Sequence, residues 1–141
     1  MTVNYQRIGL IGAGAMGRGI AQIAAQAGSE VLLLDSFAGA AERGREALIA
    51  QWNKLHEKGK LDAAARDAQI ARVQAVDSIQ ALAGCDLVIE AVIEDLEVKR
   101  KLFREIETVV APTATLVTNT SSLSVTAIAA GFWNGRYELV M

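Results

Sequence analysis

Short continuous apolar runs alternate along this chain with longer segments in which apolar residues recur every three or four positions. The continuous runs are typical of buried strands and cover 7–11, 31–35, 73–76, 86–91 and 115–118. The periodic segments predict helices at 15–27, 38–55, 62–71, from about 96 and at 124–130, with a shorter helix between 77 and 84 and a last strand at 136–141. Strands separated by helices predict an α/β fold with a mostly parallel, doubly wound sheet and a helical hairpin inserted after the second strand.

Side-chain spacing adds detail to two of these helices. In the first helix one face collects the apolar residues Met16, Ile20, Ile23, Ala24 and Ala27. In the hairpin, Trp52 stands at helical spacing from Leu48 and Leu55, which favours packing over a role as a stacking platform. The only histidine, His56, lies in the same hairpin and is interpreted as a structural residue.

A glycine-rich turn joins the first strand to the first helix. The segment 12–17 reads Gly12-Ala13-Gly14-Ala15-Met16-Gly17, which is the spacing of a dinucleotide-binding loop, and here it follows a strand and opens a helix. In such a loop the first glycine permits the tight turn, the second leaves room for a pyrophosphate and the third allows close packing of the helix. The amides at the helix start then face the phosphates. The turn therefore predicts a Rossmann-type fold and a nicotinamide dinucleotide bound along 12–17.

An acidic residue, Asp35, closes the second strand. A carboxylate at this place accepts hydrogen bonds from the adenosine ribose and repels a 2′-phosphate. No arginine follows directly, since Ser36 and Phe37 come next. We therefore predict NAD as the cofactor in preference to NADP.

Composition and charge narrow the classes of protein to which the chain can belong. The 141 residues suit one domain, and 52% hydrophobic with 21% charged residues indicates a globular chain. The net charge of −2 offers no basic field for nucleic acid, and the apolar runs are too short to span a membrane. The single cysteine, Cys85, fits a reducing compartment and is interpreted as a small buried apolar group. No secretory signal is visible, no metal site is expected, and we expect a cytoplasmic protein.

Three stretches carry a resemblance to one family. They are 8–35, then Cys-Asp-Leu-Val-Ile-Glu-Ala-Val-Ile-Glu-Asp-Leu-Glu-Val-Lys at 85–99, and Thr-Asn-Thr-Ser-Ser-Leu-Ser at 118–124. Over residues 6 to about 131 the chain resembles the N-terminal NAD-binding domain of 3-hydroxyacyl-CoA dehydrogenases, which include 3-hydroxybutyryl-CoA dehydrogenases. The resemblance implies NAD-dependent oxidation of a 3-hydroxyacyl-CoA to a 3-ketoacyl-CoA, of the type found in fatty-acid β-oxidation.

The resemblance also implies roles for individual residues. Glu94 and Lys99 match positions that contact the nicotinamide half of the cofactor. Asn119 and Ser121 match catalytic positions where the nicotinamide meets the substrate hydroxyl, and Ser121 would hydrogen-bond the reacting oxygen. Lys54 falls near a position that contacts CoA. From the residues alone, Glu94 and Lys99 also suit a solvated helix start with an exposed lysine, and 119–122 suits a turn with a helix cap.

The chain also departs from that family. The family's catalytic histidine motif is not found, and the segment from Phe132 does not resemble the family. We therefore expect residues 1–141 to form the NAD-binding domain alone, without the helical domain that binds substrate and forms the homodimer of the full-length enzyme. The chain by itself is expected to be inactive. The alternatives are a non-catalytic NAD(H)-binding module and the cofactor domain of a related 3-hydroxy acid dehydrogenase.

Overall fold

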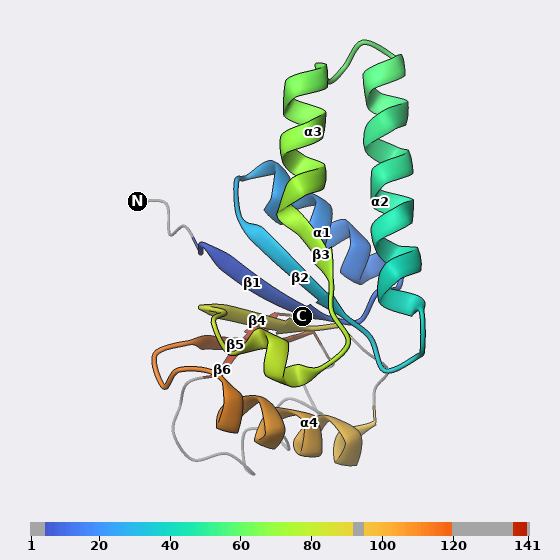
Figure 1. Ribbon diagram of the computed structural model, residues 1–141. Helices are drawn as coiled ribbons and strands as arrows, with labels where there is room; N and C mark the ends of the chain where they lie inside the picture. The colour runs from blue at the N-terminus through green and yellow to red at the C-terminus, as the bar shows by residue number, and fades with distance from the viewer. Residues whose placement is uncertain (1–4, 92–94, 120–136, 141) are drawn as a thin grey trace.

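A single twisted sheet forms the middle layer of the protein (Figure 1). The computed structural model describes residues 5–91, 95–119 and 137–140. Within them the strands are β1 (Arg7–Ile11), β2 (Glu30–Leu34), β3 (Val73–Ala75), β4 (Leu87–Glu90), β5 (Thr115–Asn119) and β6 (Tyr137–Val140). The strand order is β3-β2-β1-β4-β5-β6, and every neighbouring pair is parallel. The order therefore reverses between β1 and β4, which is the switch point at which such sheets bind ligands.

Helices cover both faces of this sheet. They are α1 (Ala15–Gln26), α2 (Ala40–Glu57), α3 (Ala63–Arg72), the 3₁₀ turn η1 (Ile79–Leu82) and α4 (Leu96–Val109). Alternate residues of one strand enter opposite layers: Leu33 packs with α1 and α2, whereas Leu32 packs with η1 and α4. The α2–α3 hairpin rises from one end of the sheet (Figure 1). The predicted α/β Rossmann fold and its inserted hairpin are confirmed.

The predicted elements agree with the structure except at their edges. Each predicted strand is found, and the one expected at 136–141 forms β6 beside β5. The short helix expected between 77 and 84 is a single 3₁₀ turn. The helix expected at 124–130 lies outside the described residues.

The apolar face assigned to α1 covers the sheet only in part: Ala24 is buried and Ile20 packs against the core, as predicted, but the larger residues of that face are exposed. The buried residues of α1 are the small ones, Gly17, Ala21, Ala24 and Ala25, whereas Met16 and Ile23 are 59% and 69% exposed. Small side chains allow the helix axis to approach the strands closely, which a row of large residues would prevent. Burial in α1 thus follows side-chain size rather than the largest apolar residues.

The α2–α3 hairpin holds its own small core. Trp52 is fully buried and Leu48 nearly so, which confirms their packing role. The Asp62 carboxylate caps α3 by accepting a hydrogen bond from the Ala65 amide at 2.7 Å. His56 is half-buried, and its Nδ1 lies 2.8 Å from the Leu61 carbonyl oxygen, so its ring serves the hairpin turn.

Cys85 lies under η1, against the sheet. Its side chain is buried, and this burial raises the pKa of the thiol to about 11. A thiol with that pKa stays protonated near neutral pH and is a poor nucleophile. The interpretation of Cys85 as a small apolar core residue is therefore confirmed.

Candidate functional site

A cleft of about 680 Å³ opens at the carboxyl ends of β1, β2 and β4. The glycine turn forms its floor, the start of α2 one wall and the start of α4 the other. Its lining consists of Ile11, Gly12, Ala13, Gly14, Arg18, Asp35, Ser36, Phe37, Ala40, Arg43, Gly44, Ala91, Asp95, Val98 and Leu102. The cleft thus coincides with the strand-order switch point, where an open parallel sheet binds its ligand.

The glycine turn depends on residues without a Cβ at two positions. Gly12 has a φ of 113°, in the region that glycine adopts without strain. A Cβ on Gly17 would collide with the Gly12 carbonyl oxygen, so the turn and the first helical turn touch backbone to backbone. Sequence reasoning assigned Gly17 to helix–sheet packing, and the contact is instead with the turn itself. A Cβ on Gly14 would meet nothing within 4 Å, which leaves open space above the turn.

The start of α1 presents an uncapped helix end to this space. Gly14 is the N-cap residue, no side chain caps the helix, and its first turn carries no acidic residue. The positive end of the helix dipole is therefore not neutralised by the chain's own carboxylates in that turn. Arg18, on the next turn, adds a cation to the lining of the cleft. Such an arrangement suits a phosphate group.

Asp35 braces the glycine turn. Its Oδ2 accepts a hydrogen bond from the Ala13 amide at 2.8 Å, and its Oδ1 accepts one from the Phe37 amide at 2.9 Å. A second backbone contact holds the same junction, since the Gly12 amide donates to the Leu34 carbonyl at 2.8 Å. Each carboxylate oxygen has a further lone pair, so Asp35 can still accept hydrogen bonds from a ribose in the cleft.

An arginine that the sequence reasoning passed over lines the same cleft. No arginine directly follows Asp35 in the sequence, but α2 brings Arg43 into the wall beside Asp35 and Ser36. Its Nη1 donates to the Ala38 carbonyl at 3.5 Å, and the residue is exposed. The signal was available in the helical pattern, because Arg43 lies one turn into α2. Arg18, which lies one turn into α1, was overlooked in the same way.

A buried ion pair lies at the ends of β4 and β5. Lys99 of α4 and Glu90 of β4 are both fully buried, and the Lys99 Nζ lies 3.2 Å from the Glu90 Oε1. The Thr118 hydroxyl donates to the same Oε1 at 2.7 Å. Sequence reasoning gave Lys99 either a cofactor contact or an exposed position. The exposed position is wrong, because the side chain turns inward to Glu90.

The other proposed site residues are only partly described. Glu94 and Ser121 lie outside the described residues. Asn119 ends β5, where its backbone pairs with Val140, and its side chain is not described. Lys54 is exposed on α2 and does not line the cleft. Among the described residues no group of three or more histidine, cysteine or acidic side chains gathers as a metal site.

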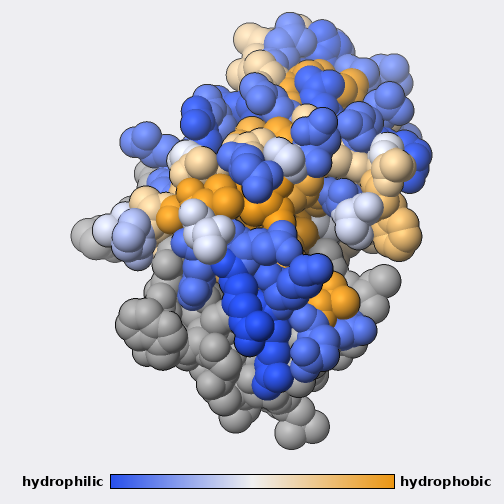
Figure 2. Space-filling model, turned by 60° about the horizontal axis from the view of Figure 1, so that its bottom comes forward, coloured by the Kyte–Doolittle hydropathy of each residue, from blue (hydrophilic) through white to orange (hydrophobic). Residues whose placement is uncertain are grey.

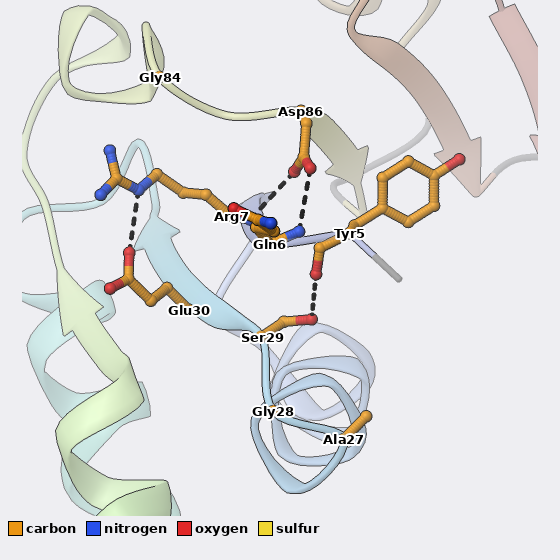
Figure 3. A pocket seen from close by; sticks show the side chains of 9 residues that line it. All are labelled: Tyr5, Gln6, Arg7, Ala27, Gly28, Ser29, Glu30, Gly84 and Asp86. Carbon is orange, nitrogen blue, oxygen red and sulfur yellow. Dashed lines mark hydrogen bonds and ion pairs between the residues drawn. The ribbon is translucent and has the colours of Figure 1, made fainter. Parts of the chain in front are cut away.

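A second hollow lies at the opposite, amino-terminal edge of the sheet (Figure 3). Its volume is about 740 Å³, but its polar groups are bonded to one another. The Asp86 carboxylate accepts from the Gln6 and Arg7 amides at 2.9 and 3.0 Å. The Arg7 guanidinium in turn pairs with Glu30 at 3.0 Å. These groups tie the strand starts together, so the hollow is not a candidate cofactor site.

The face that carries α4 is mainly hydrophilic. Figure 2 turns this side forward and shows a band of hydrophilic residues with hydrophobic ones gathered beside it. Helix α4 buries Phe103 and Ile106 together with Lys99, and it places Glu97, Lys101, Arg104 and Glu105 in solvent. No helix among the described residues is long and apolar enough to cross a membrane.

Comparison with known proteins agrees with this geometry. The family model for the 3-hydroxyacyl-CoA dehydrogenase NAD-binding domain matches residues 7–141. The chain belongs to this family. The match continues to residue 141, so the expectation that the segment from Phe132 departs from the family was wrong.

Several relatives align with most of this chain. The 3-hydroxyadipyl-CoA dehydrogenase of Escherichia coli K12 is 46% identical over 95% of this chain and 28% of its own length. A probable 3-hydroxybutyryl-CoA dehydrogenase of Deinococcus radiodurans is 42% identical over 87% of this chain and 44% of its own. The crystal structure of 3-hydroxybutyryl-CoA dehydrogenase from Escherichia coli K12 matches with a TM-score of 0.91 and 44% identity, over 97% of this chain and 29% of that one. The chain therefore spans less than half the length of these relatives.

The residues of this 3-hydroxyacyl-CoA dehydrogenase NAD-binding domain fit NAD as cofactor. The glycine turn leaves space where a Cβ would fill it, and the uncapped start of α1 faces that space. Asp35 lies at the end of β2, where an acid meets the adenosine ribose. NAD is thus the cofactor that both the family and the cleft support.

Proposed function

We propose that this chain is the cofactor-binding part of an NAD-dependent dehydrogenase that oxidises a 3-hydroxyacyl-CoA to a 3-ketoacyl-CoA. The observation that carries the proposal is the cleft itself, in which the glycine turn, Asp35 and the carboxyl ends of β1 and β4 meet. The relatives support the substrate class, because their names specify 3-hydroxybutyryl-CoA and 3-hydroxyadipyl-CoA. Both are 3-hydroxy thioesters of CoA.

Each part of the cleft has one task in this proposal. The amides at the start of α1 bind the pyrophosphate, with Arg18 as a supporting cation. Asp35 binds the adenosine ribose. The bound cofactor supplies the acceptor for the hydride that leaves C3 of the substrate. We assign Glu94 to the nicotinamide half, Asn119 and Ser121 to the reacting hydroxyl, and Lys54 to CoA, as the family resemblance implies.

The isolated chain is proposed to bind cofactor and to turn over substrate slowly. The hydroxyl proton needs a general base, and the only histidine of the chain, His56, bonds the Leu61 carbonyl in the hairpin and does not line the cleft. A general base contributes about 10²–10⁴-fold to rate. This placement of His56 favours, for the chain as given, the second function of a non-catalytic NAD(H)-binding module.

The proposal also covers the compartment, the type of pathway and the oligomeric state of the full-length enzyme. We propose a cytoplasmic enzyme of the β-oxidation type that acts as a homodimer at full length. The names of the relatives support a short acyl or dicarboxylic acyl substrate.

Two measurements test the proposed function. Titration of the chain with NADH, followed by fluorescence, is expected to give saturable binding that ADP-ribose competes. Incubation with NAD and 3-hydroxybutyryl-CoA is expected to give turnover well below about 1 s⁻¹, the low end of ordinary enzyme rates. Absence of NADH binding by the folded chain would refute the proposal. Turnover above that rate would refute the module as the function of the chain alone and would make His56 the first base to mutate.

A further inference from the structure

The buried pair of Glu90 and Lys99 is not explained by stability. Taking two charges out of water costs about as much as their attraction returns, and apolar residues of the same volume often stabilise a fold better. Here both side chains have no exposed surface. The Lys99 Nζ also lacks an aligned hydrogen bond to any described residue, although an ammonium has three donors. Lys99 is thus held to Glu90 by charge, while Glu90 also accepts the Thr118 hydroxyl hydrogen bond, and the position of the pair needs another reason.

Its position is the nicotinamide side of the switch point. Glu90 is the last residue of β4, and its register partner on β1 is Ile11, the residue before the glycine turn. The neighbours of the pair, Ala91 and Val98, both line the cleft. In a doubly wound sheet the β1–β3 half holds the adenosine part of a dinucleotide, and the β4–β6 half holds the other nucleotide. Asp35 lies on the adenosine side, so the ion pair lies on the nicotinamide side.

The nicotinamide ring is the group whose charge changes in the reaction. The ring is a cation in NAD⁺ and becomes neutral when it has accepted a hydride. An unpaired charge near it would favour one of these two forms. A carboxylate would favour NAD⁺, and an ammonium would favour NADH. A pair of opposite charges, buried where water screens little, cancels most of this bias.

We propose that Glu90 and Lys99 are positioning residues that balance the affinity of the cleft for NAD⁺ and NADH. Thr118, which is almost fully buried, fixes the carboxylate by donating to its Oε1 from β5. This proposal rests on the proposed function only in requiring that the cleft binds both forms of the cofactor. It assigns the pair to electrostatic balance.

The test compares the ratio of the dissociation constants for NAD⁺ and NADH in matched variants. Glu90→Gln leaves the ammonium unbalanced, and the ratio is expected to rise roughly tenfold, the effect of one partly screened unit charge. Lys99→Gln leaves the carboxylate unbalanced, and the ratio is expected to fall by about as much. The double variant is expected to return within about threefold of wild type. In both single variants the glutamine amide can still hydrogen-bond the remaining charge.

A control removes the same charge far from the cleft. Glu30→Gln deletes one carboxylate from an exposed ion pair with Arg7 at the opposite edge of the same sheet. Its ratio is expected to equal that of wild type. NADH is followed by fluorescence, and NAD⁺ by its displacement of NADH.

The outcomes separate this proposal from the proposed function. If the folded wild-type chain binds neither form, the proposed function fails. If it binds both, but the two single variants shift the ratio in the same direction or by less than about threefold, the balancing role is refuted. Loss of one partner of a buried pair is strongly destabilising. A variant that unfolds in buffer is therefore measured in trimethylamine oxide, which favours the compact state, beside wild type in the same solution.

Discussion

Replacing Asp35 is expected to weaken both the cofactor site and the fold. The sequence assigned Asp35 to the ribose alone, and removal would then affect only affinity. The structure gives the same carboxylate two backbone partners, the amides of Ala13 and Phe37. Asp35→Ala leaves these two donors without their acceptor and removes the side-chain contact between the glycine turn and the end of β2. Affinity and stability are therefore expected to fall together.

The size of both effects follows from the hydrogen bonds. A hydrogen bond to a charged acceptor contributes about 1.5–3 kcal/mol, and less where water reaches it. Asp35 is half-buried, so the loss of two such bonds is expected to lower the free energy of unfolding by about 2–3 kcal/mol in total. Loss of the ribose contact is expected to weaken NADH binding by at least about tenfold. Asp35→Asn keeps one acceptor oxygen and is expected to lose about half as much stability.

The assay combines urea unfolding with fluorescence titration of NADH and NADPH. Wild type is expected to prefer NADH, and Asp35→Asn to narrow that preference, because it removes the charge that repels a 2′-phosphate. An Asp35→Ala chain as stable as wild type would refute the bracing of the glycine turn. Equal or tighter NADPH binding by wild type would refute the role of Asp35 in cofactor choice.

The other predictions concern the cleft lining and the core. Gly17→Ala places a methyl group against the Gly12 carbonyl and is expected to cost about 1–3 kcal/mol of stability and most of the NADH affinity. Gly19→Ala, whose added methyl group meets no atom within 4 Å, is expected to stabilise α1 by about 0.5–1 kcal/mol. Melting curves and NADH titrations check both variants. Arg43→Ala is expected to weaken NADPH more than NADH, since a guanidinium beside Asp35 is the cleft's cation for a 2′-phosphate; equal losses in the two titrations would contradict this. Burial raises the pKa of Cys85 from 9.0 to about 11, so the stability that its neutral thiol contributes is complete below about pH 9 and is lost as pH rises through 11. Unfolding measured across this range is expected to show a decline of up to about 2 kcal/mol, and Cys85→Ala to remove it.

Much of the fold followed from the sequence because strong local signals agreed. The strand Arg7–Ile11 is uniformly apolar after its first residue, and the glycine turn that follows it is typical of a strand-to-helix junction of this kind. The helix predicted at 62–71 begins where expected, because Asp62 caps α3 through the Ala65 amide. In contrast, the apolar stripe of α1 misled, because Ile23 is apolar and yet exposed. Periodicity shows which residues share a face of the helix. Where the helix packs closely on the sheet, however, the residues that become buried are the small ones.

The parts of the site that sequence reasoning missed depend on contacts between distant segments. Lys99 and Glu90 are nine positions apart along the chain, on different elements, and only the packing of α4 against β4 buries them together. Lysine is almost never buried unless it is paired, so an isolated reading of α4 places Lys99 in solvent. Arg43 reaches the cleft because α2 begins at Ala40, a short loop after Asp35, and its first turn forms one wall. These residues differ from the glycine turn in a physical respect. A turn is specified by its own backbone, whereas the charge that a cleft presents is specified by whatever the tertiary fold places beside it. The cofactor class can therefore be predicted from residues 12–17. The relative affinity for NAD⁺ and NADH that we propose depends instead on Glu90 and Lys99, which only the tertiary fold brings together.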